Sequence, residues 1–517
     1  MRVRISRSAR HPARALWLVL FILAALTAVP RLSHGAETAS SPSADSGASA
    51  DSLQQLQQLQ QLQRELEQEQ TRIRALEQRL EADEAARAAA ASAASSQAAV
   101  NPNTLYGSFG TTGFTLQNAD GSDVIHFRGN ASVDGRYFSD AYTPESADTW
   151  LIRRLRPTLE GTLDENFDFR LMPDFGQGKT ILQDAWADVR IEPWLVFQAG
   201  KFKAPVGLER LQLEQFARFI EVSLPSDLLP YRDLGAKLGG VIDQGVFTYD
   251  VGVFDGTLDG GSTDGNSVPD MDSTGKFTWE GRIFGEPFLK SNVIWLEQLG
   301  LGIAGTYVND TGVATTTTTT SLLASYKTPG QQSMFSYRAD TATGFNNATI
   351  AQGIERRVVP QFYYYYGPWN LLGEYVNEDQ QVRRNLSATG ARTATLHNTG
   401  WEIQGAWFLT GENEGYARAT PKRNFDFGRG GAGAWELIAR YHEIHFDQQA
   451  FTDGTSSFAN PTSSPAAAHA IGTGVNWYLN PNYKLQLDYE VTRYDGGAVA
   501  GNRPDERALT LQTALIF

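Results

Sequence analysis

The side-chain period of the sequence becomes 2 near residue 105, and this constrains the fold more than any other feature. In YKLQLDYEV (483–491), Tyr, Leu and Val side chains share one face, while Lys, Gln, Asp and Glu share the other. Successive side chains of a strand point to opposite faces of its sheet. One face is too apolar for open water and the other is too polar for a soluble core. The pattern therefore predicts a β-barrel with lipid outside and water inside.

The same alternation recurs along the chain, and the connections between the alternating segments are of two kinds. Segments 127–137, 277–283 and 401–409 alternate as 483–491 does. Short turns rich in Pro, Asn and Gly alternate with long polar stretches, which is the asymmetry of an outer-membrane barrel. Aromatic residues beside the short turns predict an interfacial girdle. These residues are Trp194, Tyr366, Trp369, Trp477, Tyr478 and Tyr483.

The final segment, ALTLQTALIF, is an alternating strand that ends on Phe517. A terminal Phe resembles the sorting signal of bacterial outer-membrane barrels. With both barrel ends in the periplasm, the strand number is even. Strands of about 10 residues plus their connections predict about 16 strands over residues 127–517. The expected fold is all-β: a transmembrane antiparallel β-barrel preceded by an N-terminal α-helical coiled coil.

The first 126 residues divide into four expected segments. Arginines before an apolar run predict a signal peptide over 1–36, with an uncleaved membrane anchor as the alternative. An Ala/Ser/Asp-rich linker (37–52) follows. Leucines at spacings of 3 and 4 then predict a periplasmic coiled coil over 53–95, whose seam is buried only against partner helices. A lone solvated helix is the alternative. Residues 96–126 form a linker and the first approach to the barrel.

Charge and composition exclude several classes of protein. The chain has 44 basic and 58 acidic residues, a net charge of −14, and no cysteine. Disulfides and thiolate metal sites are therefore excluded, and the excess of acidic residues argues against nucleic acid as a partner. No stretch after the first 36 residues is apolar for 18 residues, which excludes a helical membrane domain.

The segment LIRRLRPTLEGTL (151–163) carries three arginines in four positions. Strict alternation directs Arg154 and Arg156 into the lumen. It places Arg153 on the lipid face, where we expect it near a rim, because an arginine at mid-membrane costs about 2–4 kcal/mol. Pairing with inward carboxylates is an equal alternative to an anion path. The arginines expected to project inward are Arg128, Arg136, Arg154, Arg156, Arg170, Arg190, Arg282 and Arg440.

Some 30 residues separate the strand ending near Lys203 from the strand starting near Gly235, too many for a simple hairpin. Apolar residues in LERLQLEQFARFIEV have helix-like spacing. We expect this segment to fold into the lumen and set the constriction. A helix packed on the barrel mouth is the alternative. Its basic residues, with those at its ends, add Lys203, Arg210, Arg218 and Arg232 to the anion-path candidates.

Several stretches in order resemble the phosphate-selective porins of the O and P type from Gram-negative outer membranes. The resemblance covers about 127–517 and implies a homotrimer of 16-stranded barrels with a basic lumen. It implies location in the outer membrane, contact with lipid and lipopolysaccharide, and passive diffusion of small anions, phosphate or polyphosphate first. The stretches are LIRRLRPTLEG, DFRLMPDF (168–175), residues 184–209 and 219–235, GAWFLTGE (405–412), AWELIARY (434–441) and residues 474–489.

The chain departs from the family pattern in the loop after the Gly-Leu-Glu stretch. Phosphate-binding members carry a lysine and then paired serines there. The matching residues are Arg210, then Leu213 and Glu214, so a positive charge remains and the hydroxyl ligands do not. The resemblance therefore implies an anion pore and leaves a general diffusion porin as the alternative.

Other functions have less support in the sequence. His442 and His445 point to opposite strand faces, so neither a catalytic histidine nor a metal pair converges there. We expect no enzyme activity, no cofactor and no metal. A barrel-anchored envelope tether, with the coiled coil contacting the cell wall, is a rival or an added role.

Overall fold

The computed structural model describes residues 104–111, 113–139, 147–256, 275–339, 341–342, 345–387 and 390–517. The signal peptide, the linker over 37–52 and the coiled coil over 53–95 lie outside these residues and stay predictions. Within the described part, no helix is long and apolar enough to cross a bilayer.

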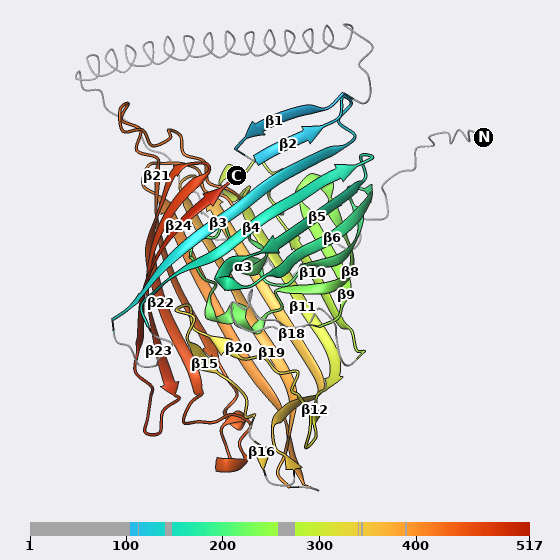
Figure 1. Cartoon of the computed structure of the whole chain (residues 1–517), viewed down its shortest axis with the longest axis vertical. Coiled ribbons are helices and arrows are strands. Elements are labelled where there is room, and N and C mark those ends of the chain that lie inside the picture. The colour runs from blue at the N-terminus through green and yellow to red at the C-terminus, as the bar shows by residue number, and fades with distance from the viewer. Residues whose placement is uncertain are drawn as a thin grey trace, which may run out of the picture. The chain divides into compact units, whose positions relative to one another are not determined.

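Sixteen strands of the described part form a closed antiparallel barrel (Figure 1). Each pairs with the next along the chain, and the last pairs back with the first, so that Ala514 lies opposite Ser132. The expectation of about 16 strands is confirmed. The strands are β3 (Val124–Phe138), β4 (Thr149–Leu163), β5 (Phe167–Asp174), β6 (Ile181–Glu192), β7 (Leu195–Lys203), β8 (Arg232–Ile242), β9 (Phe247–Phe254), β10 (Thr278–Gly285), β11 (Leu299–Thr311), β18 (Thr349–Tyr366), β19 (Trp369–Asn385), β20 (Ala391–Phe408), β21 (Ala434–His445), β22 (Pro465–Asn480), β23 (Tyr483–Gly496) and β24 (Glu506–Ile516).

Smaller elements are not part of this ring of paired strands. The hairpin of β1 (Tyr106–Gly110) and β2 (Gly113–Gln117) pairs with the first residues of β3. The connection after β11 contains three short pairs: β12 (Val313–Ala314) with β13 (Thr319–Thr320), β14 (Tyr326–Lys327) with β15 (Ser333–Phe335), and β16 (Thr341–Ala342) with β17 (Phe345–Asn346). The 3-10 helices outside the lumen are η3 (Gly176–Gly178), η5 (Asp243–Gly245), η6 (Ile294–Leu296), η7 (Gln448–Ala450) and η8 (Gly454–Ser456).

The two ends of the barrel differ in their connections. At the end that holds the C-terminus, which we call the turn end, two residues join β18 to β19 and β22 to β23 (Figure 1). At the opposite loop end, the connections span 312–348 and 446–464. This agrees with the predicted asymmetry, with two exceptions. The β10–β11 connection, residues 286–298, and the β20–β21 connection, residues 409–433, are long although they lie at the turn end.

The strands alternate as the sequence predicts. On β23, Lys484 is 1% exposed while its near neighbour Leu487 is 42% exposed. Polar side chains therefore face the lumen and apolar ones face outward. Of the predicted girdle, Trp194, Tyr366 and Trp369 are about half exposed at the turn end. Tyr478 departs from the prediction, because its side chain is buried and its hydroxyl donates to Glu436.

A β-bulge changes the facing of residues in LIRRLR. Ser132 pairs with Arg154 and Val133 with Ile152, which leaves Arg153 as the extra residue. An extra residue shifts the alternation on one side of it by one. Ile152 is 53% exposed and Arg153 is 1% exposed. The expectation that Arg153 anchors a rim on the lipid face is therefore wrong, since all three arginines have buried side chains.

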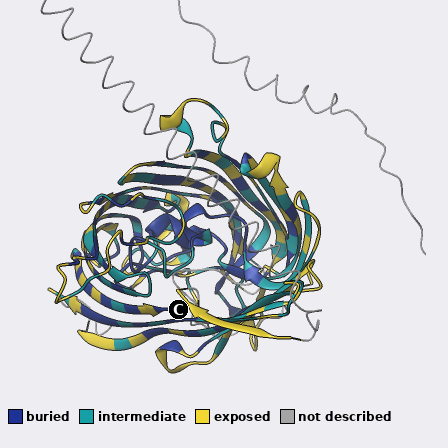
Figure 2. Cartoon of the chain, turned by 90° about the horizontal axis from the view of Figure 1, so that it is seen from above, coloured by how far each residue is buried: buried dark blue, intermediate teal, exposed yellow. Residues whose placement is uncertain are grey.

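Residues 204–231, between β7 and β8, fold into the barrel; we call them the lumen loop. Seen along the barrel, buried segments fill the interior of the ring of strands (Figure 2). The loop contains α3 (Leu208–Leu211) and η4 (Leu224–Leu228). The expected position in the lumen is confirmed, but the helix-like spacing yields only one turn. Beyond α3 the backbone N–H groups of Ile220 and Leu224 donate to wall side chains instead of to helix carbonyls.

Candidate pore constriction

The lumen loop lies between two walls of opposite charge. The basic wall, on β3 to β5, consists of Arg128, Arg136, Arg153, Arg154, Arg156 and Arg170. The acidic wall, on β19 to β23, consists of Glu374, Glu402, Glu436, Asp488 and Glu490. The loop presents carboxylates to the basic wall. It presents an arginine and backbone N–H groups to the acidic wall.

Glu221 is the first loop residue that contacts the basic wall. Arg153 donates to both of its carboxylate oxygens, with Nε 2.7 Å from Oε1 and Nη2 2.9 Å from Oε2. Arg136 Nη2 lies 2.7 Å from Oε1. Burial alone would raise the pKa of Glu221, but the charges and hydrogen bonds of these arginines hold it at about 2. Glu221 is therefore ionised and held by a bidentate contact with Arg153.

Glu214 is the second such residue, and it neutralises three cations. Its carboxylate lies 3.2 Å from Lys203, 3.2 Å from Arg232 and 3.3 Å from Arg156. Burial opposes the charge of Glu214, yet the surrounding cations hold its pKa well below the usual range. Lys203 and Arg232 stand at the two ends of the lumen loop, so Glu214 ties the middle of the loop to its ends.

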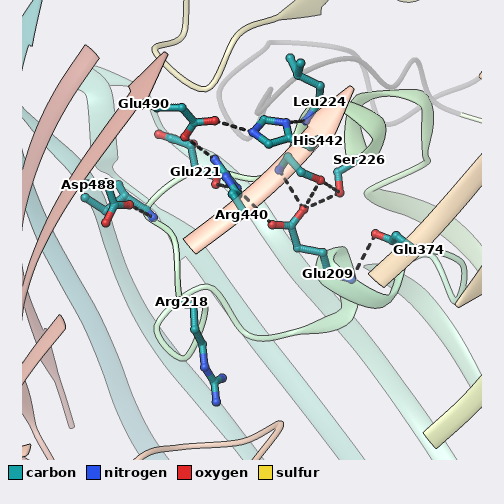
Figure 3. Close-up of polar contacts among 12 residues, drawn as sticks. Glu209, Arg218, Glu221, Leu224, Ser226, Glu374, Arg440, His442, Asp488 and Glu490 are labelled. Atoms are coloured by element: carbon teal, nitrogen blue, oxygen red, sulfur yellow. Dashed lines mark hydrogen bonds and ion pairs between the residues drawn. The ribbon is translucent and has the colours of Figure 1, made fainter. Parts of the chain in front are cut away.

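The lumen loop supplies hydrogen-bond donors to its contacts with the acidic wall. Arg218 pairs with Glu414 at 2.5 Å and with Glu436 at 3.2 Å. The Ile220 N–H donates to Asp488 at 2.7 Å, and the Leu208 N–H donates to Glu374 at 2.8 Å (Figure 3). These partners lie far away in the sequence, on strands of the acidic wall or, for Glu414, in the β20–β21 connection, which is why no local pattern predicts the contacts.

Glu209 and Arg440 form the centre of the contact between loop and acidic wall (Figure 3). Glu209 Oε2 accepts from the hydroxyls of Ser223 and Ser226 at 2.8 and 2.7 Å. Arg440 lies 3.5 Å from Glu209 and 2.7 Å from Glu490. The cluster thus joins two parts of the loop to each other and to β21 and β23.

A second segment, the β20–β21 connection, also contacts the lumen loop. The Tyr416 hydroxyl donates to the Leu208 carbonyl at 2.5 Å, and Gln212 Nε2 donates to the Tyr416 carbonyl at 3.0 Å. Glu414 from the same segment pairs with Arg218. Sequence reasoning missed this segment. Its length was the available signal, because it is the longest connection at that end in the described part of the chain.

The predicted path residues divide by exposure. Arg128, Arg170 and Arg190 have side chains 39%, 25% and 43% exposed. Arg128 and Arg170 share Glu160 at 2.9 and 2.6 Å, and Arg190 pairs with Asp168. The other set is buried apart from the half-buried Lys203, and its members have carboxylate or backbone partners: Arg136, Arg154, Arg156, Lys203, Arg210, Arg218 and Arg232. Buried members of the set hold the loop in place.

Arg128 and Arg170 of the exposed set line a cavity between the loop and the basic wall, whereas Arg190 does not. The cavity has a volume of about 230 Å³. Four arginines and two glutamates are among its lining residues: Arg128, Arg156, Arg170, Arg418, Glu160 and Glu214. Glu214 of the loop also lines the cavity and pairs with the buried Arg156. This cavity is where the structure leaves guanidinium groups within reach of a solute.

Arg282 stands apart from both sets. Its Nε donates to Gln361 at 2.8 Å, and its guanidinium lies 4.4 Å from the centre of the Phe284 ring. Among the described residues it forms no ion pair with a carboxylate. It lies on β10, away from the basic wall, so the structure does not bring it together with the other candidates.

A closed antiparallel barrel with an apolar outer face, a polar lumen and an inward-folded loop is the architecture of an outer-membrane channel. A family model described as "Phosphate-selective porin O and P" matches residues 125–517. The chain belongs to that family, and family and fold support a Gram-negative outer-membrane location and a channel rather than an enzyme.

Solved structures of similar fold are outer-membrane proteins. OmpT of Vibrio cholerae is 10% identical, with 77% of this chain and 98% of that chain covered and a TM-score of 0.45. The channel DcaP of Acinetobacter baumannii is 8% identical, with 78% of this chain and 99% of that chain covered and a TM-score of 0.44. An anion-selective porin from Comamonas acidovorans is 11% identical over 76% and 100%, with a TM-score of 0.43. No curated protein matches the chain.

Proposed function

We propose that this porin passes small anions by passive diffusion, with phosphate or polyphosphate as the leading solutes. The cavity beside the basic wall carries the proposal, because arginine predominates among its charged side chains and Arg128 and Arg170 are partly exposed. A guanidinium never loses its proton at physiological pH and binds oxyanions through two parallel donors. Such groups offset part of the hydration that an anion loses on entry.

The partial pairing of these arginines favours transit over tight binding. Arg128 and Arg170 each contact Glu160, so an anion competes with a carboxylate for them. Conduction requires sites that bind strongly enough to admit an ion and weakly enough to release it. Leu213 and Glu214 offer no hydroxyl ligand in the loop, so a general diffusion porin without phosphate specificity is the alternative.

We also propose that the chain assembles as a homotrimer with its N-terminal segment in the periplasm. The leucine seam within 53–95 supports this, since it is buried only against partner helices. Contact of this segment with the cell wall would add a tethering role. Deleting 53–95 separates the two roles: loss of envelope integrity with unchanged conductance supports the tether, and intact envelopes argue against it.

The path is tested by the double variant Arg128→Gln/Arg170→Gln in planar bilayers. We expect a lower anion-to-cation permeability ratio and a severalfold weaker block of chloride current by phosphate. Arg356→Gln is the matched control, because Arg356 is exposed on the outer face of β18 and is expected to leave both quantities unchanged. If the double variant kept the wild-type permeability ratio, Arg128 and Arg170 would not belong to the anion path. If phosphate did not block the chloride current of the wild-type pore, this would contradict phosphate as the leading solute and leave the passage of small anions standing.

A further inference from the structure

A cluster of ligating side chains lies on the outward face of β21 and β22, away from the lumen. Glu443 Oε1 is 3.1 Å from His445 Nε2, and Glu443 Oε2 is 3.2 Å from His469 Nδ1. One potential ligand atom from each of the three residues lies within 4.8 Å of the others. His442, the residue before Glu443, points into the lumen. Because strand residues alternate, Glu443 and His445 of RYHEIHF point outward.

The donor atoms of these residues suit a tetrahedral metal ion, and they already lie close together. Zinc binds histidine nitrogen and carboxylate oxygen at about 2.0–2.2 Å, so neighbouring ligand atoms of a tetrahedral site lie about 3.3 Å apart. The separations of 3.1 and 3.2 Å run to the two different oxygens of Glu443, and one ligand atom from each of the three residues lies within 4.8 Å of the others, so small side-chain movements would bring all three to an ion. Two imidazoles and one carboxylate are also the donors that a borderline-soft divalent ion of the zinc class prefers. Calcium, by contrast, requires a shell of oxygen ligands.

A supporting shell holds the three ligands in position. His469 uses its other nitrogen, Nε2, to contact Asp495 at 3.2 Å. Metal-bound histidines typically donate their second N–H to such a carboxylate, which fixes the ring. The Trp401 N–H donates to Glu443 Oε1 at 2.6 Å, and the Tyr441 hydroxyl donates to Oε2 at 2.7 Å. Glu443 is thereby fixed between the two histidines.

The cluster lies at the outer boundary of the apolar band. Ten positions along β21 separate Trp435 from His445, which is about 33 Å along the strand and about 25 Å in height at a tilt of about 40°. The apolar band of such barrels is about 25 Å tall. Trp401, which pairs with Glu443 two positions before His445, lies close to this boundary. The side chains of His445 and His469 are 44% and 30% exposed, which leaves an ion access from solution.

We propose that Glu443, His445 and His469 bind one divalent transition-metal ion of the zinc class on the outer surface of the barrel. Asp495, Trp401 and Tyr441 act as the supporting residues. The fourth coordination position faces outward and takes water or an anionic oxygen from the surroundings.

The test is equilibrium binding of Zn²⁺ to the purified full chain in detergent, with Ca²⁺ as a second probe. We expect one tightly bound Zn²⁺ per chain and no Ca²⁺ bound at this site. His469→Ala is expected to abolish the tight site. Asp495→Asn, which keeps all three ligands, is expected to weaken it about 10–100-fold. His397→Ala is the matched control, since His397 also lies near the loop end and pairs with a carboxylate, Asp379, outside the three-ligand group.

Two results would overturn the proposal. One is the absence of saturable Zn²⁺ binding to the wild-type chain, which would leave the cluster as histidine–carboxylate pairs. The other is unchanged binding in His469→Ala. Glu443→Gln provides a second variant of nearly the same shape, expected to bind Zn²⁺ at least tenfold more weakly. Electrophoresis without heating verifies that each variant retains a folded barrel.

Discussion

Arg153 Nε lies 2.7 Å from Glu221 Oε1, although strict alternation along β4 places Arg153 on the lipid face. The bulge in β4 turns this arginine into the lumen, where Arg136 contacts the same carboxylate. The bulged residue therefore supplies one of the two arginines that bind Glu221 of the lumen loop. Charge pairing, rather than helix formation, determines where the loop rests.

Replacing Glu221 tests how much its ion pairs with the two arginines stabilise the protein. Glu221→Gln leaves the buried Arg153 and Arg136 without their shared carboxylate, and breaking a buried pair from one side costs about 3–5 kcal/mol. We expect a loss of that size in the free energy of unfolding, measured by urea titration in detergent, and larger current fluctuations in single channels. Glu165→Gln, in an exposed turn, serves as the control. Equal stability of both variants would show that the pairing contributes little.

Asp227, in η4 of the lumen loop, is expected to give the protein a pH-dependent stability. Burial raises the pKa of Asp227 to about 7, with Arg210 opposing the shift. A carboxyl whose folded pKa lies above the unfolded value of about 3.9 contributes stability below that value. This stability is lost as the pH rises through about 7.

The measurement is the free energy of unfolding of wild type and Asp227→Asn between about pH 3 and about pH 8, which brackets the two pKa values given above. We expect the difference between the two proteins to change with pH across this window, because only the wild type gives up the proton. A constant difference would mean that Asp227 titrates alike in the folded and unfolded chains.

Glu214 is expected to limit the anion preference of the pore. Glu214→Gln leaves Lys203, Arg232 and Arg156 without their shared carboxylate beside the cavity. One charge at 4 Å in water is worth about 1 kcal/mol, less when salt screens it, so we expect a two- to fivefold rise, roughly, in the anion-to-cation permeability ratio. Glu214→Asp keeps the charge and should change the ratio little. A fall in the ratio of the Gln variant would place Glu214 outside the path.

Alternation along the strands was enough to predict the barrel, because side chains facing lipid and side chains facing water differ in chemistry at every second position. It predicted the inward side chains of Arg128, Arg154, Arg156 and Arg170 correctly. It failed at Arg153, because nothing in LIRRLR distinguishes a bulged strand from a regular one.

The loop could be predicted to enter the lumen, but its conformation could not. Helix-like spacing describes what a segment does by itself, whereas Ile220 and Leu224 donate to Asp488 and His442, more than 200 residues away. The same limit explains why the contact between Tyr416 and Leu208 escaped notice. Tyr478 was assigned to the girdle from its neighbours, while its own position on β22 turns it inward.

The reversal potential of the purified protein in planar bilayers under a salt gradient tests the central claim most directly. The cavity beside the basic wall predicts a value on the anion side, closer to the equilibrium potential of chloride than to that of potassium. A reversal potential on the cation side would contradict an anion path through this lumen.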